Sequence, residues 1–525
     1  MSLSFSRFEA PERLREIQSK LRVPEPCMRA LIISGLLAAI FFSVGYWRSP
    51  ERPTAPGQGW LGYWDQAAYY RSIAALEAHD FDPSQHRYPL GYPLIGSLLY
   101  PLTPLQPFFV PDALCYLGFA LALTAVALRF ISPVESILVC FFGLIRSSIF
   151  LRAYVVPWTN IPVNTALAVL SWLVLTGRKD RFAGIVTGIC ASLIFTTRPG
   201  DLVFTLPLIA AYWFGCRTWG EARERLVPVV FGALPFTLLD VLLSFAIYGS
   251  LISEAYRTAT VFMGYGLKGL PIRLYTFLID SHLLFPEKNT LVTVYPFLLL
   301  IVPGIIVFVK RYRWQAGVIL LAQFGCLLYF FSYNDFWISH IFVFGAMRYI
   351  LWVVPFCFLY AYLSIRLAWR VLGVPLTLGL MILPILLWSL PQLSLYNVAY
   401  QLPESKPSAW PCIPGAGRTC HLHMEFAEPE DFDVIKVRGT REETLTWSTA
   451  SLDGHREQMF RDYYAGDESN GETYIFFYTR QKTRSIDLTV SSEVGPVPSF
   501  VFSNLQLARY RLGFALRSPF RRFHQ

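Results

Sequence analysis

The segment Gly62–Arg71 places the acidic residue Asp65 among aromatic side chains. A carboxylate in such surroundings can act as a general base that takes a proton from an attacking hydroxyl or amine. The residues that follow have the spacing of an amphipathic helix, with Tyr69, Ile73 and Leu76 on one side. Because Asp is a preferred N-cap and this helix begins directly after it, a capping role is the alternative interpretation.

Two arginines, Arg198 and Arg348, each lie at the end of an apolar segment. The planar guanidinium of Arg fits phosphate through parallel hydrogen bonds, so both residues are candidates for phosphate binding. Arg198 precedes Pro199-Gly200, and this pair predicts that a helix breaks there and exposes backbone donors. The alternative is that both side chains only extend their charges to a membrane surface, as Arg commonly does.

Further titratable side chains gather in three segments of the first two thirds of the chain. They are His79, Asp80, Asp82, His86, Asp280, His282 and His340. Carboxylates and imidazoles of this kind can bind a divalent cation, and Mg²⁺ or Mn²⁺ would be a possible cofactor. Their spacing is not diagnostic of a metal site, so the metal stays unknown and a structural or solvated role is the main alternative.

The scaffold that positions these residues follows from the composition. Apolar residues make up 54% of the 525 residues and charged residues only 15%. Soluble domains contain about 25% charged residues, so the sequence predicts a polytopic α-helical membrane protein. The net charge of +9 lies mainly in short loops between apolar runs. This distribution indicates a lipid bilayer as partner and not a nucleic acid.

A helix that crosses a bilayer needs about 20 mostly apolar residues. The first such segment, Met28–Trp47, follows a basic stretch that should be cytoplasmic. Later basic clusters fall on the same side in a topology of about eleven spans, which places the candidate residues on the opposite, external side. The ten later spans are predicted at Pro111–Phe130, Val134–Phe150, Asn160–Thr176, Ala183–Phe195, Leu202–Phe214, Leu226–Ile247, Leu291–Val309, Gly317–Phe331, Tyr349–Ile365 and Val374–Leu390.

This topology divides the chain into three parts. Residues 1–27 form a cytoplasmic segment, residues 28–390 the membrane domain, and residues 391–525 an extracytoplasmic domain. Residues 48–110 then form the first external loop, in which Leu90–Tyr100 is too short for a span and predicts an interfacial helix. We expect the protein in a plasma membrane or bacterial inner membrane, with its N-terminus in the cytoplasm.

The C-terminal part has a different period. Its apolar segments are short, rich in β-branched and aromatic residues, and separated by turn residues; they are Val434–Val437, Thr444–Trp447, Tyr474–Tyr478, Ile486–Val490 and Phe500–Phe502. This pattern predicts an antiparallel β-sandwich. Cys412 and Cys420 either pair in an oxidising compartment or remain free thiols. A zinc site formed with His423 is a weaker interpretation.

Several segments, taken in chain order, form a recognisable set. They are Asp65-Gln66-Ala67-Ala68-Tyr69-Tyr70, Arg87-Tyr88-Pro89-Leu90-Gly91-Tyr92-Pro93-Leu94, Thr197-Arg198-Pro199, Tyr248-Gly249-Ser250 with Phe285-Pro286 and Tyr295-Pro296, and Gly345-Ala346-Met347-Arg348-Tyr349-Ile350 with Pro355. This set resembles the GT-C class of integral-membrane glycosyltransferases, especially the family-39-like branch that uses polyprenyl-phosphate-linked sugars. Two residues depart from the family pattern. Leu90 replaces a usual proline, and Asn160 stands where many relatives have Asp.

The resemblance implies an inverting transfer of a sugar from polyprenyl phosphate to a lipid, glycan or protein acceptor on the extracytoplasmic face. It implies that Asp65 is the base that activates the acceptor. The donor would be bound by Arg198, Arg348, Arg87, Tyr88 and Tyr69. The departure at Asn160 leaves the requirement for a divalent cation open.

Two other functions fit the same composition. A transporter or flippase of a lipid-linked substrate also needs polar residues on its spans, but it usually places them at the bilayer midplane in two related halves. A non-catalytic anchor that displays the C-terminal domain is the second alternative. It would leave Asp65 and Arg198 without a purpose.

Overall fold

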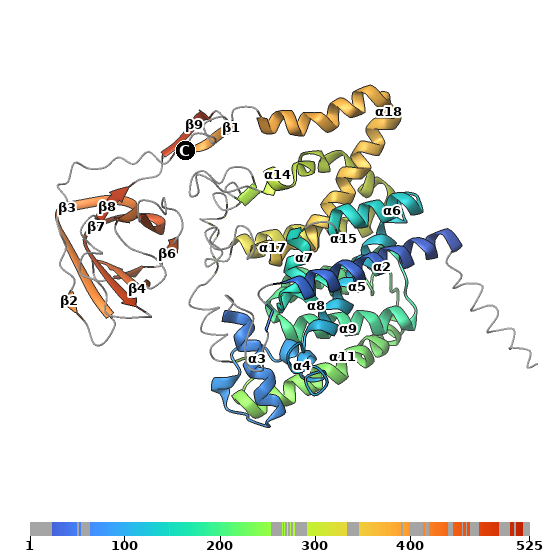
Figure 1. Cartoon of the computed structure of the whole chain (residues 1–525), viewed down its shortest axis with the longest axis horizontal. Coiled ribbons are helices and arrows are strands. Elements are labelled where there is room, and N and C mark those ends of the chain that lie inside the picture. Colours follow the sequence, from blue (N-terminus) through green and yellow to red (C-terminus); the bar gives the residue numbers. More distant parts are fainter. Residues whose placement is uncertain are drawn as a thin grey trace, which may run out of the picture.

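The computed structural model describes residues 24–49, 52–53, 64–145, 148–253, 291–332 and 346–389, single positions between 265 and 278, and strand segments between 392 and 517. Up to residue 389 the described chain is helical, and the later described segments are strands (Figure 1). The change of period in the sequence therefore marks a real change of secondary structure, from helix to strand, after the predicted membrane domain.

The helices differ widely in length. Five are long and apolar enough to cross a membrane, at Glu25–Arg48, Phe109–Ala127, Trp219–Tyr248, Phe297–Ser332 and Val353–Gly373, and four shorter apolar helices accompany them in the described residues. This set agrees with a polytopic helical membrane protein by length and composition. The number of spans and their orientation remain predictions.

The described residues contain a series of helices along the chain. They are α2 (Glu25–Arg48), α3 (Trp64–Glu77), α4 (Gly91–Ser97), α5 (Phe109–Ala127), α6 (Pro133–Cys140), α7 (Ser148–Val155), α8 (Asn160–Thr176), α9 (Arg181–Thr197), α10 (Leu202–Ala210), α11 (Trp219–Tyr248), α14 (Leu291–Val294), α15 (Ile301–Ser332), α17 (Ala346–Ile350) and α18 (Val353–Ser389). Helices α2, α8, α9 and α11 cover the predicted spans in their part of the chain, and α5 ends at Ala127, before the predicted limit Phe130. The bounds of α8 coincide with those predicted.

Several predicted spans have other limits. Helix α15 joins two of them across a sharp bend at Arg313, whose φ is 41°, and α18 joins another two across a bend at Gly373. The predicted span Val134–Phe150 was wrong as a single α-helix, because α6 passes into a π-helical turn at Phe141–Ile145. The predicted span Leu202–Phe214 ends early, since α10 stops at Ala210.

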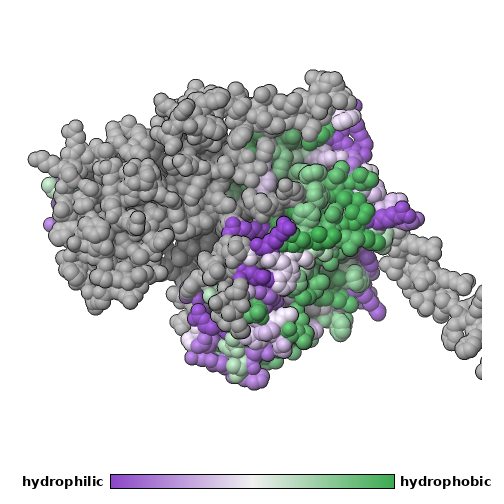
Figure 2. Space-filling view, viewed as in Figure 1, coloured by the Kyte–Doolittle hydropathy of each residue, from purple (hydrophilic) through white to green (hydrophobic). Residues whose placement is uncertain are grey.

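The exposed surface of the helical part is apolar in a broad band. Figure 2 shows this band bordered by hydrophilic residues toward α3 at one end and toward the start of α2 at the other. Large apolar side chains of α2 and α11 are exposed within it, including Leu36 and Phe231. A contiguous apolar surface of this kind is typical of contact with lipid.

Two glycines allow close contacts of α9 with α11 and with α4. A Cβ at Gly188 in α9 would lie 2.0 Å from the carbonyl oxygen of Val229 in α11, so only glycine permits this approach. A Cβ at Gly91, the first residue of α4, would lie 2.5 Å from Oγ1 of Thr196 near the end of α9. The residues that follow Asp65 in sequence are thereby brought against the end of α9.

The amphipathic helix predicted after Asp65 is confirmed as α3. Tyr69 and Ile73 are buried, at 2% and 0% exposure. The Tyr69 ring packs against Tyr88 and Tyr92 with centroid distances of 5.1 and 5.4 Å, and Tyr92 stacks on Phe108 at 4.3 Å. The interfacial helix predicted at Leu90–Tyr100 corresponds to α4, and its first residues are buried in this aromatic cluster.

The C-terminal strands are β1 (Gln392–Asn397), β2 (Ile413–Pro414), β3 (Thr419–Arg438), β4 (Leu445–Leu452), β5 (His455–Glu457), β6 (Met459–Asp462), β7 (Glu472–Ser492), β8 (Leu505–Ala508) and β9 (Arg511–Arg517). All pairings are antiparallel. β1 pairs with β9, and a seven-stranded sheet has the order β2-β3-β7-β4-β5, with β6 added to β7 and β8 added to β3.

The antiparallel β structure of the C-terminal part is confirmed in outline, and a sandwich of two facing sheets stays a prediction. The expectation of separate strands at Tyr474–Tyr478 and Ile486–Val490 was wrong, because polar residues between them also pair with β3 and continue β7. Phe500–Phe502 and Cys412 lie outside the described residues. The pairing of Cys412 with Cys420 therefore stays a prediction.

Candidate functional site

The Asp65 side chain lies between a phenol and a guanidinium. The Tyr88 hydroxyl donates to Asp65 Oδ1 at 2.5 Å, and Arg348 Nη1 lies 3.6 Å from Asp65 Oδ2. Both charged side chains are partly buried, with exposures of 26% for Asp65 and 17% for Arg348. Residues far apart in sequence, from α3, the loop before α4 and α17, thus meet at one carboxylate.

The capping interpretation of Asp65 is wrong. The helix begins at Trp64, so Asp65 lies inside its first turn. Its carboxylate accepts a hydrogen bond from Tyr88 and faces Arg348, as described above. The early acidic position still favours the helix through its dipole, but the side chain belongs to the polar cluster.

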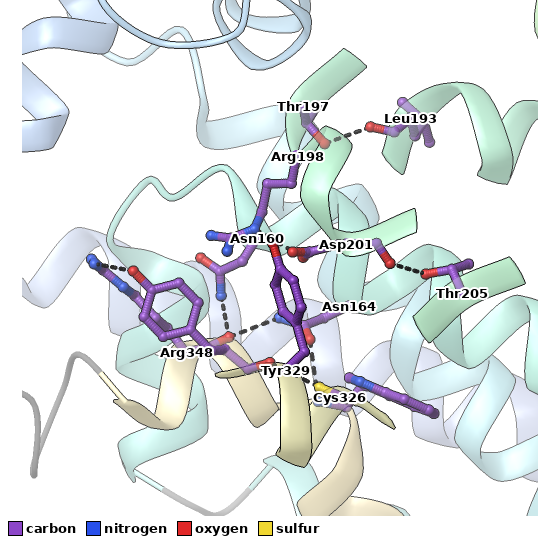
Figure 3. A network of polar contacts seen from close by, with 12 residues as sticks. Asn160, Asn164, Leu193, Thr197, Arg198, Asp201, Thr205, Cys326, Tyr329 and Arg348 are labelled. Carbon is purple, nitrogen blue, oxygen red and sulfur yellow. Dashed lines mark hydrogen bonds and ion pairs between the residues drawn. The ribbon is translucent and has the colours of Figure 1, made fainter. Parts of the chain in front are cut away.

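The guanidinium of Arg348 is held by aromatic and polar groups. It lies 3.8 Å from the centroid of the Trp158 ring, a distance typical of a cation–π contact. Its Nη2 donates to the Tyr349 hydroxyl at 2.8 Å. The backbone oxygen of Arg348 accepts from the side-chain amides of Asn160 and Asn164 on α8 (Figure 3). Arg348 is therefore fixed both at its backbone and at its charged end.

Arg198 also contacts the Tyr349 ring. Its guanidinium is 4.7 Å from the centroid of that ring and 5.5 Å from that of Phe330, and its Nε donates to Asp201 Oδ2 at 2.9 Å. The predicted helix break is confirmed, since α9 ends at Thr197 and a 3₁₀ turn follows at Pro199–Asp201. Because of this turn, the Asp201 carboxylate faces the guanidinium of Arg198, which lies three residues earlier in the sequence (Figure 3).

The site therefore contains two carboxylate–guanidinium pairs that share one aromatic ring. The Tyr349 ring contacts both guanidinium groups, at 4.7 Å for Arg198 and 4.8 Å for Arg348. Each guanidinium is paired with its own carboxylate, Asp201 or Asp65, so an anionic group binds here in competition with those carboxylates. Such an arrangement can bind a phosphate and, at Asp65, accept a proton.

The two tyrosines assigned to donor binding border the carboxylate. Burial, followed by the negative charge of Asp65, raises the pKa of the Tyr69 and Tyr88 hydroxyls above the ordinary value. Both therefore remain protonated at neutral pH, which fits the observed donation from Tyr88 to Asp65. Among the predicted donor-binding residues the structure thus brings Tyr69, Tyr88, Arg198 and Arg348 together.

The remaining titratable residues of the first loop form a turn beside this cluster. Ser72 bonds His86 Nδ1 at 2.8 Å and the Asp80 carbonyl bonds His86 Nε2 at 2.9 Å, so both ring nitrogens have structural partners. Asp82 caps the short helix Pro83–Gln85, and the Ser84 N–H holds the pKa of Asp82 below its ordinary value.

The other members of the predicted set lie at the surface or outside the described residues. His79 and Arg87 have exposed side chains, and the Arg87 carbonyl accepts from the Ser253 hydroxyl. Asp280, His282 and His340 fall outside the described residues. Within the described part of the chain, three or more metal-ligating side chains do not gather anywhere, and the requirement for a metal stays open.

Four residues of the site went unassigned in the sequence. Trp158 and Asn164 contact Arg348, Asp201 contacts Arg198, and Tyr349 contacts both arginines. A signal existed for Asp201, because an acidic residue at a membrane helix end is a functional candidate by default. The same rule points to Asp112, which is fully buried in α5 and accepts two contacts from the Tyr92 hydroxyl.

Comparison with protein-family models, with curated proteins and with solved structures finds no significant match for this chain. Its function is therefore argued from the residues of the site and their geometry.

Proposed function

We propose that the protein is an inverting glycosyltransferase that uses a polyprenyl-phosphate-linked sugar as donor. The observation that carries this proposal is the position of the Asp65 carboxylate between the Tyr88 hydroxyl and the Arg348 guanidinium, with Arg198 in contact with the same Tyr349 ring. The proposed general base and the two proposed phosphate-binding cations then belong to one cluster of side chains.

The two arginines supply the donor site. Their guanidinium groups bind the phosphate that links sugar and lipid, and they stabilise the negative charge that develops on this phosphate as it leaves. The partly buried setting, with 17% exposure at Arg348 and 16% at Arg198, strengthens this interaction relative to one in water. Tyr69, Tyr88 and the exposed Arg87 border the same donor site.

Asp65 supplies the base. An acceptor hydroxyl or amine attacks the anomeric carbon from the face opposite the phosphate, its proton moves to Asp65, and the bond from carbon to phosphate oxygen breaks. The electron pair of that bond leaves with the polyprenyl phosphate. Arg348 lies 3.6 Å from the Asp65 carboxylate, so donor phosphate that engages this guanidinium competes with Asp65 for it.

The membrane setting completes the proposal. The apolar band of exposed helical surface suits the polyprenyl chain, and the topology of about eleven spans places the site on the extracytoplasmic face. In this topology the C-terminal β-sandwich is extracytoplasmic as well. The acceptor is a lipid, glycan or protein, and a divalent cation at the site remains possible.

Donor turnover by the purified protein tests the proposal. A panel of polyprenyl-phosphate sugars with a membrane extract as acceptor is incubated with wild type, Asp65→Asn and the control Asp80→Asn, which changes an exposed carboxylate of the same loop. We expect release of polyprenyl phosphate by wild type and by the control, and a loss of at least about 100-fold for Asp65→Asn. Equal activity of all three proteins would remove Asp65 as the base.

A further inference from the structure

We infer that Asn160 and Asn164 are positioning residues that hold Arg348 in the geometry needed to bind phosphate. This inference rests on the proposed function, because Arg348 is there the phosphate-binding cation. Asn160 was noted in the sequence only as a departure from a family pattern, and Asn164 was not singled out. Their contacts with Arg348 assign both a role in the arrangement of the site.

The two amides form a clamp on one backbone oxygen. Asn160 and Asn164 lie one helical turn apart on the same face of α8, and the Nδ2 groups of both donate to the Arg348 carbonyl, at 3.1 Å for Asn164 (Figure 3). Asn164 Oδ1 also accepts from the backbone N–H of Trp352 at 3.3 Å. The clamp therefore spans the connection from α17 to α18.

Helix α17 needs such an anchor. Its described part is Ala346–Ile350, and a helical segment of this length has little stability of its own. The segment before α8 also provides the Trp158 ring, 3.8 Å from the guanidinium. One element thus fixes both the backbone and the charged end of Arg348, and the guanidinium is directed toward Asp65.

Unsatisfied polar atoms show that this contact is not arranged for stability alone. Asn160 Oδ1 and Arg348 Nε are buried and lack hydrogen-bond partners among the described residues. Buried polar atoms without partners destabilise a fold. Asn160 and Asn164 are each only 2% exposed, and their amides supply the partners of the Arg348 carbonyl and the Trp352 N–H. The polar pair is explained if it serves to place Arg348.

Two substitutions separate this role from a contribution to folding. Asn164→Asp keeps the oxygen that accepts from Trp352 but replaces the donor to Arg348 by a second acceptor. Asn164→Leu has similar size, adds no charge and removes both contacts. Thr165→Val is the matched control, because Thr165 is the next residue of α8 and donates to the Cys115 carbonyl at 2.9 Å, away from Arg348.

The primary measurement is the dissociation constant of polyprenyl phosphate, with the full-length protein in lipid nanodiscs. The control measurement in the same samples is the thermal unfolding temperature. We expect both Asn164 variants to raise the dissociation constant about tenfold, as misplacement of one charge-assisted contact would do. Thr165→Val should change only the unfolding temperature.

The opposite pattern overturns the inference. If the Asn164 variants bind polyprenyl phosphate like Thr165→Val at a similar loss of stability, the clamp is structural only. Where the Asn164 variants do not fold, Asn160→Ser removes one of the two bonds and should still raise the constant several-fold. Wild type that binds polyprenyl phosphate but turns over no donor would refute the proposed function and leave the positioning role standing.

Discussion

Arg348 faces Asp65 and is also a proposed ligand of the donor phosphate. This double role gives a prediction that the assignment of Asp65 as a base alone does not make. Asp65 and the donor phosphate compete for the same guanidinium, since Arg348 Nη1 lies 3.6 Å from Asp65 Oδ2. Asp65→Asn keeps an oxygen that accepts from Tyr88 but removes the competing charge. We therefore expect this variant to lose turnover and at the same time to bind polyprenyl phosphate more tightly than wild type.

The size of this effect follows from the geometry. Two unit charges 3.6 Å apart attract by about 1 kcal/mol in water and by about 4–5 kcal/mol at an effective dielectric constant near 20. The carboxylate is 26% exposed and the guanidinium 17%, so the lower part of this range applies. A gain of about 1–2 kcal/mol corresponds to about 5- to 30-fold tighter binding.

Equilibrium binding of polyprenyl phosphate to wild type and Asp65→Asn measures the effect, at low and at high salt. The gain should shrink at high salt, because ions screen a partly exposed charge pair. Asp80→Asn controls for the loss of a negative charge elsewhere in the same loop. Weaker binding by Asp65→Asn would refute the competition and show that the carboxylate helps to hold the donor.

Two further predictions concern other charge pairs. Arg198→Ala should raise the donor KM about tenfold. Because Asp201 is only 5% exposed, the same variant should also destabilise the fold by about 3 kcal/mol. The double variant Arg198→Ala/Asp201→Asn should regain stability in thermal unfolding but should not regain donor affinity. In the C-terminal part, the hydrogen bond to Asp487, 2.5 Å from His423 Nδ1, raises the pKa of that histidine. The stabilisation that this contact gives the fold is complete below the pKa of His423 in the unfolded chain, and it is lost as pH rises through the higher pKa of His423 in the folded chain. The difference in unfolding temperature between wild type and His423→Gln should therefore shrink from pH 6 to pH 9.

The long apolar helices were predictable because apolar length decides them. Helix α8 has the predicted bounds Asn160–Thr176. The bends at Arg313 and Gly373 lie where the sequence predicted connections between spans. Pairing along β7 could not be predicted, because its polar middle is stabilised by cross-strand partners on β3 and not by local preference.

The candidate site was predictable in residue type and not in geometry. The residue types and their positions indicated Asp65, Arg198 and Arg348 as chemical groups, and the family resemblance implied Tyr88 as a donor-binding residue. The contact between Asp65 and Arg348 joins residues more than 280 positions apart, and such contacts arise only from the packing of α3, α8 and α17. The two asparagines carry no charge, so the sequence alone offered no reason to connect them with Arg348.

The most direct test of the central claim is coupled product formation by the purified protein. Labelled sugar on the acceptor and released polyprenyl phosphate are quantified together for wild type and Asp65→Asn under conditions where both proteins are equally folded. We predict equal amounts of the two products for wild type and neither product above background for the variant. Sugar transfer by Asp65→Asn at the wild-type rate would contradict the assignment of Asp65 as the base.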